Sequence, residues 1–172
     1  MPQEVINMEQ KNQPLVTIVM GSTSDEEKVL PAIKYLQELE VPFEVRVASA
    51  HRTPHLVEEI VLEAQTTRVF IAAAGMAAAL PGCIAALTRK PVIGLPLSSK
   101  YYLEDSILAM LQMPPGVPVL TVGVDAAKNA AVAACQILAI SDHELDAKLT
   151  KQSAAMANKV VDTDAVIREK YS

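Results

Sequence analysis

The sequence predicts an α/β protein built on a parallel β-sheet. Two observations lead to this prediction. Short apolar runs rich in Val and Ile recur along the chain, and segments with apolar residues three or four positions apart lie between them. Such alternation is typical of right-handed βαβ crossovers, which place helices on the faces of a parallel sheet. With 172 residues, of which 51% are hydrophobic and 3% aromatic, the chain is long enough to bury one core of small aliphatic side chains.

Strands are expected at the apolar runs, because a short, nearly continuous apolar run is typical of a strand buried on both faces. These runs are residues 15–20, 43–47, 69–73, 91–96 and 118–122. Helices are expected where apolar residues recur with helical spacing. These segments are one marked by Val29, Ile33, Leu36 and Leu39, one that starts at Pro54 and includes Val57, Ile60, Val61 and Ala64, and residues 83–87, 103–111 and 126–139.

A long helix is expected after Asp142, whose carboxylate is placed to cap its first turn. Its apolar stripe comprises Leu145, Leu149, Met156, Val160 and Ile167. The five-stranded domain, residues 14–141, is complete before this helix, so we expect residues 142–172 to pack on a neighbouring subunit; packing on the domain's own sheet is the alternative. The polar residues 1–13 are expected to be disordered.

The composition narrows the classes of function. A net charge of -5 and a pI near 5.2 argue against broad binding to nucleic acid or to an anionic membrane, which needs a basic surface. The sequence has no apolar stretch of membrane-spanning length and a polar start, so we expect a cytoplasmic protein. Cys83 and Cys135 are isolated and are expected to be reduced and buried. The sequence also lacks metal-ligand clusters, so no metal is expected.

His51 and Arg52 are the first candidate site residues. They follow the second expected strand and precede a helix that begins at Pro54, with Thr53 in the N-cap position. Ligands of open α/β folds bind at the carboxyl ends of the strands, where this loop lies. A histidine is more often structural, but here neutral His51 could take a proton and protonated His51 could return it. His55 is expected to be a solvated surface residue.

The second candidate is the loop at residues 21–25, which follows the first strand and starts a helix. Its backbone N–H groups and hydroxyls suit a phosphate. Asp25 would repel a phosphate, which favours a role as acceptor for ribose hydroxyls. The alternative is that Ser24 or Asp25 only caps the helix. Neither the Rossmann dinucleotide pattern nor the P-loop pattern occurs in the chain.

Two further loops have weaker signals. Residues 75–82 offer backbone and small apolar side chains, which suit either the close approach of a ligand or tight packing of a strand against a helix. A polar and aromatic patch after the fourth strand could cover a site, and a solvated loop explains it equally well. This patch comprises Tyr101, Tyr102, Glu104 and Asp105.

Taken together, these segments resemble the PurE family of purine biosynthesis. The matching segments occur in family order between residues 15 and 150 and comprise residues 20–25, 49–54, 77–82, 91–94, 112–114 and 128–131. The resemblance implies a three-layer flavodoxin-like fold with a five-stranded parallel sheet, assembled as a homo-octamer in which the C-terminal helix reaches a neighbour. It also implies a reaction that needs no metal or organic cofactor.

The reaction that the resemblance implies converts N5-carboxyaminoimidazole ribonucleotide to 4-carboxyaminoimidazole ribonucleotide by moving a carboxylate from N5 to C4. A separate ATP-dependent carboxylating enzyme would supply this small-molecule substrate. In the family's roles, Ser22, Ser24 and Arg52 hold the 5'-phosphate end, Asp25 holds the ribose, and His51 moves the C4 proton. The remaining substrate-binding residues that the resemblance implies are Ser49, Gly75, Ala78, Ala79 and Leu80.

Two positions depart from the usual mutase pattern Gly-Gly-Ala-Ala-His-Leu-Pro-Gly: Met76 replaces the second Gly, and Ala79 replaces the His. The carboxylase branch, which adds carbon dioxide directly to aminoimidazole ribonucleotide, also lacks that His. It tends, however, to have Lys where this chain has Arg52, and Ser-Asn at residues 77–78. Arg52 and the segment at residues 80–82 favour the mutase; direct carboxylation is the first alternative, and a ribonucleotide-binding paralogue without activity is the second.

Overall fold

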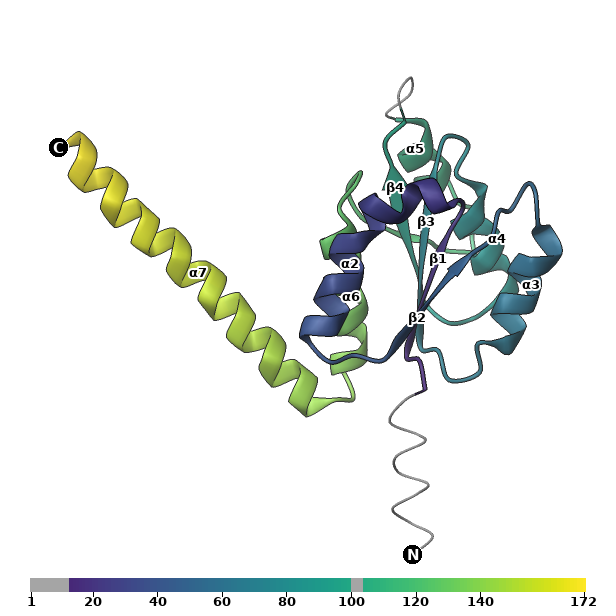
Figure 1. Ribbon diagram of the computed structural model, residues 1–172, viewed down its shortest axis with the longest axis horizontal. Coiled ribbons are helices and arrows are strands. Elements are labelled where there is room, and N and C mark those ends of the chain that lie inside the picture. Colours follow the sequence, from purple (N-terminus) through teal and green to yellow (C-terminus); the bar gives the residue numbers. More distant parts are fainter. Residues whose placement is uncertain (1–12, 100–103) are drawn as a thin grey trace, which may run out of the picture. The chain divides into compact units, whose positions relative to one another are not determined.

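The computed structural model describes residues 13–99 and 104–172. A five-stranded parallel sheet in the order β2-β1-β3-β4-β5 forms its centre, which confirms the predicted fold class (Figure 1). The strands are β1 (Val16–Met20), β2 (Phe43–Val47), β3 (Val69–Gly75), β4 (Val92–Leu97) and β5 (Leu120–Thr121). The chain leaves β1 toward β2 on one side and returns to β3 on the other, which creates a topological switch point at the carboxyl ends of β1 and β3.

Helices cover both faces of the sheet and complete the three layers. They are α2 (Glu26–Glu38), α3 (Pro54–Glu63), α4 (Ala79–Leu87), α5 (Asp105–Leu111), α6 (Ala127–Ala139) and α7 (His143–Tyr171), with a 3-10 turn η1 (Thr23–Asp25) before α2. In Figure 1, α2 lies with the part of α6 up to Ala134 on one face, while α3 and α4 lie on the other, where α5 contacts α4. The structure does not describe residues 100–103, so Tyr101 and Tyr102 of the predicted polar and aromatic patch lie outside the described residues.

The core consists of small aliphatic side chains, as the composition predicts. The residues of β1, β3 and β4 are buried almost throughout, and Ala130, Ala131 and Ala134 of α6 are fully buried. Gly94 shows how tight this packing is: a Cβ atom added there would lie 2.6 Å from Val119 Cγ1 and 2.9 Å from Met110 Sδ. At this point of the sheet, only a residue without a side chain fits between its neighbours.

Helix α4 begins at Ala79 rather than at the predicted Cys83. Pro81 lies in its first turn, where the missing backbone N–H would have had no helical partner, so the proline does not break the helix. Strand β4 likewise includes Pro96. The Pro96 carbonyl accepts a hydrogen bond from Asp125 N at 2.9 Å, on the side where β5 has already ended, so the proline removes no ladder hydrogen bond.

The two cysteines differ in environment, and one prediction about them is wrong. Both are free, but Cys83 is exposed because it lies on the outer side of α4, whose buried residues are Leu80, Pro81 and Ile84. Cys135 is buried as predicted, and burial raises the pKa of its thiol to about 11. The Cys135 thiol is therefore protonated and unreactive at neutral pH.

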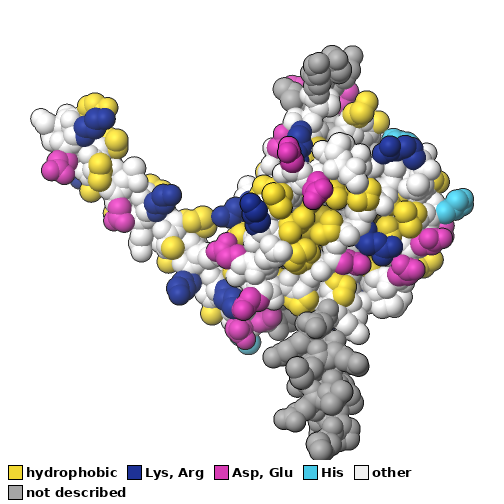
Figure 2. Space-filling view, viewed as in Figure 1, with side chains coloured by type: hydrophobic (Ala, Val, Ile, Leu, Met, Phe, Trp, Pro, Cys, Tyr) yellow, Lys and Arg dark blue, Asp and Glu magenta, His cyan; other side chains and the backbone are white. Residues whose placement is uncertain are grey.

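The chain divides into two compact units, one extending to Ala134 and the other running from Cys135 to Ser172. In the second unit the predicted N-cap is confirmed: Asp142 Oδ1 accepts hydrogen bonds from the backbone N–H groups of Glu144 and Leu145 at 3.1 and 3.0 Å. Helix α7 has exposed apolar side chains along its length (Figure 2). None of the helices in the described part of the chain combines the length and hydropathy needed to span a membrane. The prediction of disorder for residues 1–13 concerns residues that lie, except for Gln13, outside the described part.

Candidate active site

A cavity of about 520 Å³ lies at the carboxyl ends of β1, β2 and β3, next to the switch point. Three loops line it, one from each strand. All the site residues predicted from the sequence are among its lining, namely Ser22, Ser24, Asp25, Ser49, His51, Arg52, Gly75, Ala78, Ala79 and Leu80. The fold therefore brings together three segments that are separated along the chain. The lining also includes Gly21, Ala50, Ala74, Met76 and Ala77, which adjoin the predicted residues in the same loops.

The loop after β1 presents hydroxyl groups and one carboxyl group to the cavity. Ser22 is the N-cap of η1: its Oγ accepts a hydrogen bond from Ser24 N at 3.3 Å and another from Ser24 Oγ at 2.9 Å. Asp25 occupies the N-cap position of α2 but makes no side-chain capping bond there. The alternative that the side chain of Ser24 or Asp25 caps the helix is therefore wrong: Ser22 caps η1, Ser24 Oγ donates to Ser22, and Asp25 makes no capping bond to α2.

The loop after β2 is held in shape by its own polar groups. Thr53 is the N-cap residue of α3 and Pro54 lies in its first turn, as predicted, but the Thr53 side chain does not cap the helix. Thr53 Oγ1 instead accepts from Ser49 N at 2.9 Å and donates to Ser49 O at 3.2 Å, while Arg52 N donates to Ser49 Oγ at 3.3 Å. This small network closes the loop around His51, whose side chain is exposed on the cavity side.

The loop after β3 supplies the apolar wall. Gly75 ends the strand with its backbone close to β4, because a Cβ atom there would lie 3.2 Å from Leu97 O. Met76 and Ala78 follow with positive φ angles of 54° and 39°, in the left-handed region that non-glycine residues adopt at a cost in energy. Ala78 and Leu80 are buried, whereas Met76 is 71% exposed at the cavity rim. Because Gly75 has no side chain and that of Ala78 is small, the backbone of this wall is accessible to a ligand in the cavity, and the two positive φ angles mark local strain there.

Opposing electrostatic effects act on Asp25. Burial raises the pKa of its carboxyl group, and this effect outweighs a backbone hydrogen bond from Ser22 and the positive charges of Lys28 and Arg52, which all lower the pKa. Arg52 is also fixed in position, because its Nη2 donates a hydrogen bond to Gly21 O at 2.8 Å. The cavity thus combines a cation and hydroxyl groups, suited to an anion, with a carboxyl group suited to sugar hydroxyls.

No group of three or more His, Cys, Asp or Glu side chains that could hold a metal ion occurs among the residues described. The lining offers instead backbone, hydroxyl groups, one guanidinium, one carboxyl and one imidazole. His51 supplies the imidazole of the lining, the side chain that most often moves protons in catalysis. His55, by contrast, is exposed on α3 and does not line the cavity, as predicted.

Residues 15–159 match the family described as AIR carboxylase. The chain belongs to this family. The resemblance inferred from the sequence motifs is confirmed, because this family model and a solved PurE structure both match the chain. A crystal structure of Treponema denticola PurE superimposes with a TM-score of 0.82 at 28% identity, and the match covers 88% of this chain and 97% of that one.

Relatives with the name N5-carboxyaminoimidazole ribonucleotide mutase match over most of their length. The Methanocaldococcus jannaschii protein is 48% identical over 157 residues, which cover 91% of this chain and 99% of that protein. The Bacillus subtilis protein is 49% identical over 145 residues, covering 81% and 90% of the two chains. A Candida glabrata protein named phosphoribosylaminoimidazole carboxylase is 41% identical. The match covers 98% of the present chain but only 31% of the fungal protein.

Proposed function

We propose that this protein is an N5-carboxyaminoimidazole ribonucleotide mutase of de novo purine biosynthesis. The observation that carries the proposal is the meeting of His51 and Arg52 with the Ser22, Ser24 and Asp25 loop around one cavity that has an apolar wall. Relatives of this name are similar over most of the chain, which supports the same reaction. The substrate is a small-molecule ribonucleotide whose phosphate, ribose and base each have a matching part of the lining.

Substrate binding follows from the chemistry of the loops. The guanidinium of Arg52 and the hydroxyls of Ser22 and Ser24 would hold the 5'-phosphate by charge-assisted hydrogen bonds. The Asp25 carboxylate would accept hydrogen bonds from the ribose hydroxyls. Ser49 also lines the cavity and would contribute a further hydroxyl. With both ends of the nucleotide held, the base would lie against the loop after β3.

The proposed reaction is an isomerisation in which atoms and charges balance. The bond between N5 and the carboxylate carbon breaks, which releases carbon dioxide, and protonated His51 gives N5 a proton, which yields aminoimidazole ribonucleotide and leaves His51 neutral. Carbon C4 then attacks the carbon dioxide, and His51 accepts the proton that C4 loses. The small apolar wall formed by Gly75, Ala78, Ala79 and Leu80 would keep water away from the carbon dioxide until the new bond forms.

Ala79 supports one alternative function. Mutase members usually have His at this position, and the carboxylase branch does not, so direct carboxylation of aminoimidazole ribonucleotide by carbon dioxide is the second candidate. The similarity to a fungal protein named as a carboxylase is consistent with it. Arg52, where that branch tends to have Lys, favours the mutase.

We further propose that the protein assembles as a homo-octamer in which residues 142–172 pack on a neighbouring subunit. The support comes from α7, whose apolar side chains are exposed in a single chain and would be costly to leave in water. The exposed apolar residues of this helix are Met156, Val160, Val161, Val166, Ile167 and Tyr171. We expect the enzyme to act in the cytoplasm, with a separate ATP-dependent carboxylating enzyme that supplies its substrate.

The decisive experiment compares two substrates on the purified protein. Product should form from N5-carboxyaminoimidazole ribonucleotide, and much more slowly from aminoimidazole ribonucleotide in bicarbonate-equilibrated buffer. The variant His51→Asn should lose turnover by about a hundredfold or more while still binding the nucleotide, because the proton carrier alone is removed. His55→Asn, on the exposed side of α3, is the matched control and should remain active.

Each other outcome has a definite meaning. Product from aminoimidazole ribonucleotide and carbon dioxide without preference for the N5-carboxylated form would assign the protein to direct carboxylation. Binding of the nucleotide with no turnover of either compound would indicate a paralogue without catalytic activity. Full activity in His51→Asn would overturn the assigned role of His51.

A further inference from the structure

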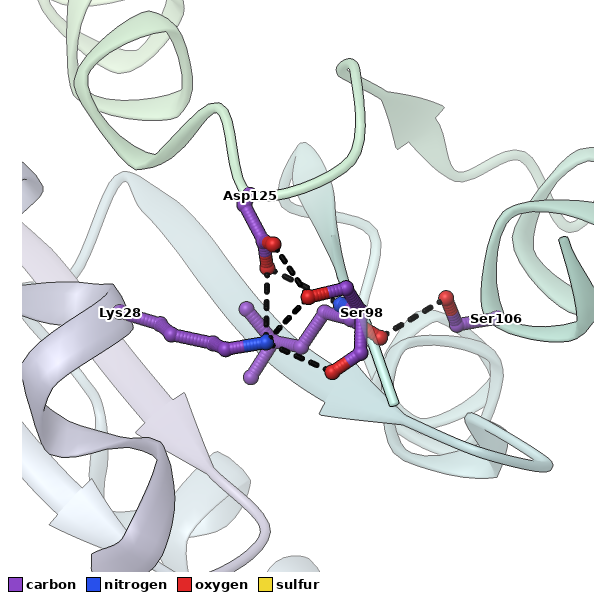
Figure 3. A network of polar contacts seen from close by, with 5 residues as sticks. Lys28, Ser98, Ser106 and Asp125 are labelled. Carbon is purple, nitrogen blue, oxygen red and sulfur yellow. Dashed lines mark hydrogen bonds and ion pairs between the residues drawn. The ribbon is translucent and has the colours of Figure 1, made fainter. Parts of the chain in front are cut away.

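A polar network lies among residues that do not line the cavity. Figure 3 shows that Lys28, from the first turns of α2, reaches across to Ser98 at the end of β4 and to Asp125 in the loop after β5. Lys28 Nζ donates to Ser98 O at 2.6 Å and to Ser98 Oγ at 2.5 Å, and it forms an ion pair with Asp125 Oδ1 at 3.2 Å. An ammonium group has three N–H donors, and these three partners use all of them.

The acceptors of this network are themselves held firmly. Asp125 Oδ1 accepts from Ser98 N at 3.0 Å, and Asp125 Oδ2 accepts a short hydrogen bond from Ser98 Oγ. Asp125 has a positive φ of 54°, and its own N–H donates to Pro96 O at 2.9 Å, which fixes the carboxylate against β4. These hydrogen bonds, from the Ser98 side chain and backbone and from Lys28, lower the pKa of Asp125 against the opposing effect of burial. The Asp125 carboxylate is therefore charged at neutral pH and holds the ammonium group in place.

Lys28 does not touch the cavity but lies one helical turn beyond Asp25, which does. The charged groups that act on Asp25 are Lys28 from α2 and Arg52 from the loop after β2, and the Ser22 and Ser24 groups add hydrogen bonds. Arg52 is the group that we assign to the substrate phosphate, so a bound phosphate would neutralise much of its charge. In the complex, Lys28 would then be the remaining cation that opposes the effect of burial on the pKa of Asp25.

We propose that Lys28 is a positioning residue of this site: anchored by Ser98 and Asp125, it holds the first turn of α2 and so places the Asp25 carboxylate, with a cation one helical turn away, to bind the ribose hydroxyls. The proposal rests on the proposed function, because it takes a ribonucleotide as the ligand of Asp25. Lys28 contributes no donor to the substrate, since its donors are already used within the network. It acts through Asp25.

The first test is made on the ligand-free protein, so it does not depend on catalysis. The carboxyl carbon of Asp25 is titrated by NMR in protein labelled with 13C-aspartate. Lys28→Met should raise the pKa of Asp25 above that in the wild type, and Lys28→Arg, which keeps the charge, should restore it. Lys34→Met removes the same charge from an exposed position of the same helix and should leave the titration unchanged. Should Lys28→Met fail to fold, Lys28→Gln removes the charge but retains hydrogen-bonding capacity and makes the same test.

The second test uses the pH dependence of KM for the N5-carboxylated ribonucleotide. With a higher pKa, Asp25 becomes protonated at a higher pH, so the variant should lose affinity earlier as the pH falls. Opposite charges one helical turn apart at a partly exposed position typically change an equilibrium by a factor of about two to five, and we expect the KM of Lys28→Met to rise by about this factor at acid pH. At alkaline pH, where Asp25 is ionised in both proteins, KM should differ little, and kcat should change less than KM throughout.

Two results would overturn the proposal. One is an Asp25 titration that is the same in Lys28→Met as in Lys34→Met; the other is a KM that rises by the same factor at every pH, which would indicate a purely structural role. A failure of the proposed function is recognised separately, because the wild type itself would then turn over neither ribonucleotide. In that case the pH dependence is measured on the binding of ribose 5-phosphate, and the same two results apply.

Discussion

The guanidinium of Arg52 donates a hydrogen bond to the carbonyl oxygen of Gly21 at 2.8 Å and so joins the loop after β2 to the loop after β1. These residues lie 31 positions apart in the chain. The bond uses one of the five N–H groups of the guanidinium and directs the rest of this group toward the cavity that both loops line. Arg52 therefore combines two roles, joining the loops and presenting a cation.

Substitution of Arg52 should weaken substrate binding more than it weakens the fold. Loss of a hydrogen bond to a charged group costs about 2 kcal/mol, so Arg52→Met should raise KM for the ribonucleotide by a factor of about thirty. Arg52→Lys should recover only part of this loss, because an ammonium group cannot bond to Gly21 and a phosphate with the same planar geometry. Steady-state kinetics with the matched control Arg68→Met, which changes an exposed arginine outside this cavity, checks the effect. A KM for Arg52→Met equal to that of the control would contradict the assignment.

The variant Asp25→Asn should stabilise the protein at neutral pH. Burial raises the pKa of Asp25, so the folded state binds a proton more readily than the unfolded state does. As the pH rises through the raised pKa, the buried carboxyl group ionises and the free energy of unfolding falls. Above this pKa the loss of stability is complete. Thermal unfolding should show that the Asn variant has the higher Tm near about pH 7.5. The Tm difference should shrink toward about pH 4, where a carboxyl group ordinarily becomes protonated. The same variant should bind the ribonucleotide more weakly, because an amide replaces the carboxylate.

An exposed carboxylate provides the control for this prediction. Asp162→Asn on α7 should have the same Tm as the wild type across the same pH range. A Tm difference for Asp25→Asn that grew toward acid pH would show that the sign of the effect is the reverse of the one expected.

Met76 is expected to carry backbone strain. Its φ of 54° is easily adopted by glycine and costs other residues about 1 kcal/mol or more. Met76→Gly should therefore increase the free energy of unfolding by up to about 1 kcal/mol, after the greater entropy that glycine loses on folding is subtracted. Met76→Ala retains the strain and removes the side chain, which is 71% exposed, so it should leave stability nearly unchanged. Urea unfolding of the two variants separates the backbone effect from that of the side chain.

Gly94 should not tolerate even a methyl group. A Cβ atom at this position would approach Val119 Cγ1 to 2.6 Å and Met110 Sδ to 2.9 Å within the core. Overpacking of this kind costs about 1 to 3 kcal/mol, so Gly94→Ala should lower the midpoint of urea unfolding. Gly123→Ala is the control, since its Cβ would meet Ala126 Cβ at an ordinary 3.6 Å. Equal midpoints for the two variants would show that the sheet relaxes around the added methyl group.

The assembly is tested on α7. If the octamer proposed above forms through this helix, replacing Val160 and Ile167 by Lys should dissociate it without unfolding the first unit, because the substitutions put charges in place of exposed apolar side chains. Light scattering would detect the change in mass, and circular dichroism would follow the fold. Replacing Lys151 and Lys159, exposed polar positions of the same helix, by Gln is the control. An unchanged mass after the lysine substitutions would exclude these side chains from a subunit contact.

The sequence by itself determined the strands, the class of fold and the three loops of the cavity. This was possible because strands buried on both faces require continuous apolar runs, and because the parallel topology places every loop that follows a strand at the same edge. The predicted start of α4 was wrong because Pro81 and Gly82 suggested a loop, although a proline is compatible with the first turn of a helix. The prediction for Cys83 was also wrong, since a short helix has an exposed side that its small residues do not reveal.

Only the tertiary structure decided how the charges of the site are arranged. Lys28 gave no signal in the sequence because its partner Ser98 lies 70 positions away, and the two meet only in the folded chain. The bond from Arg52 to Gly21, the strain at Met76 and the raised pKa of Asp25 likewise depend on distances across the fold and on burial. Apolar patterning is a property of neighbouring residues and can be recognised in a sequence, whereas the electrostatic state of a side chain depends on every group that folding brings near it.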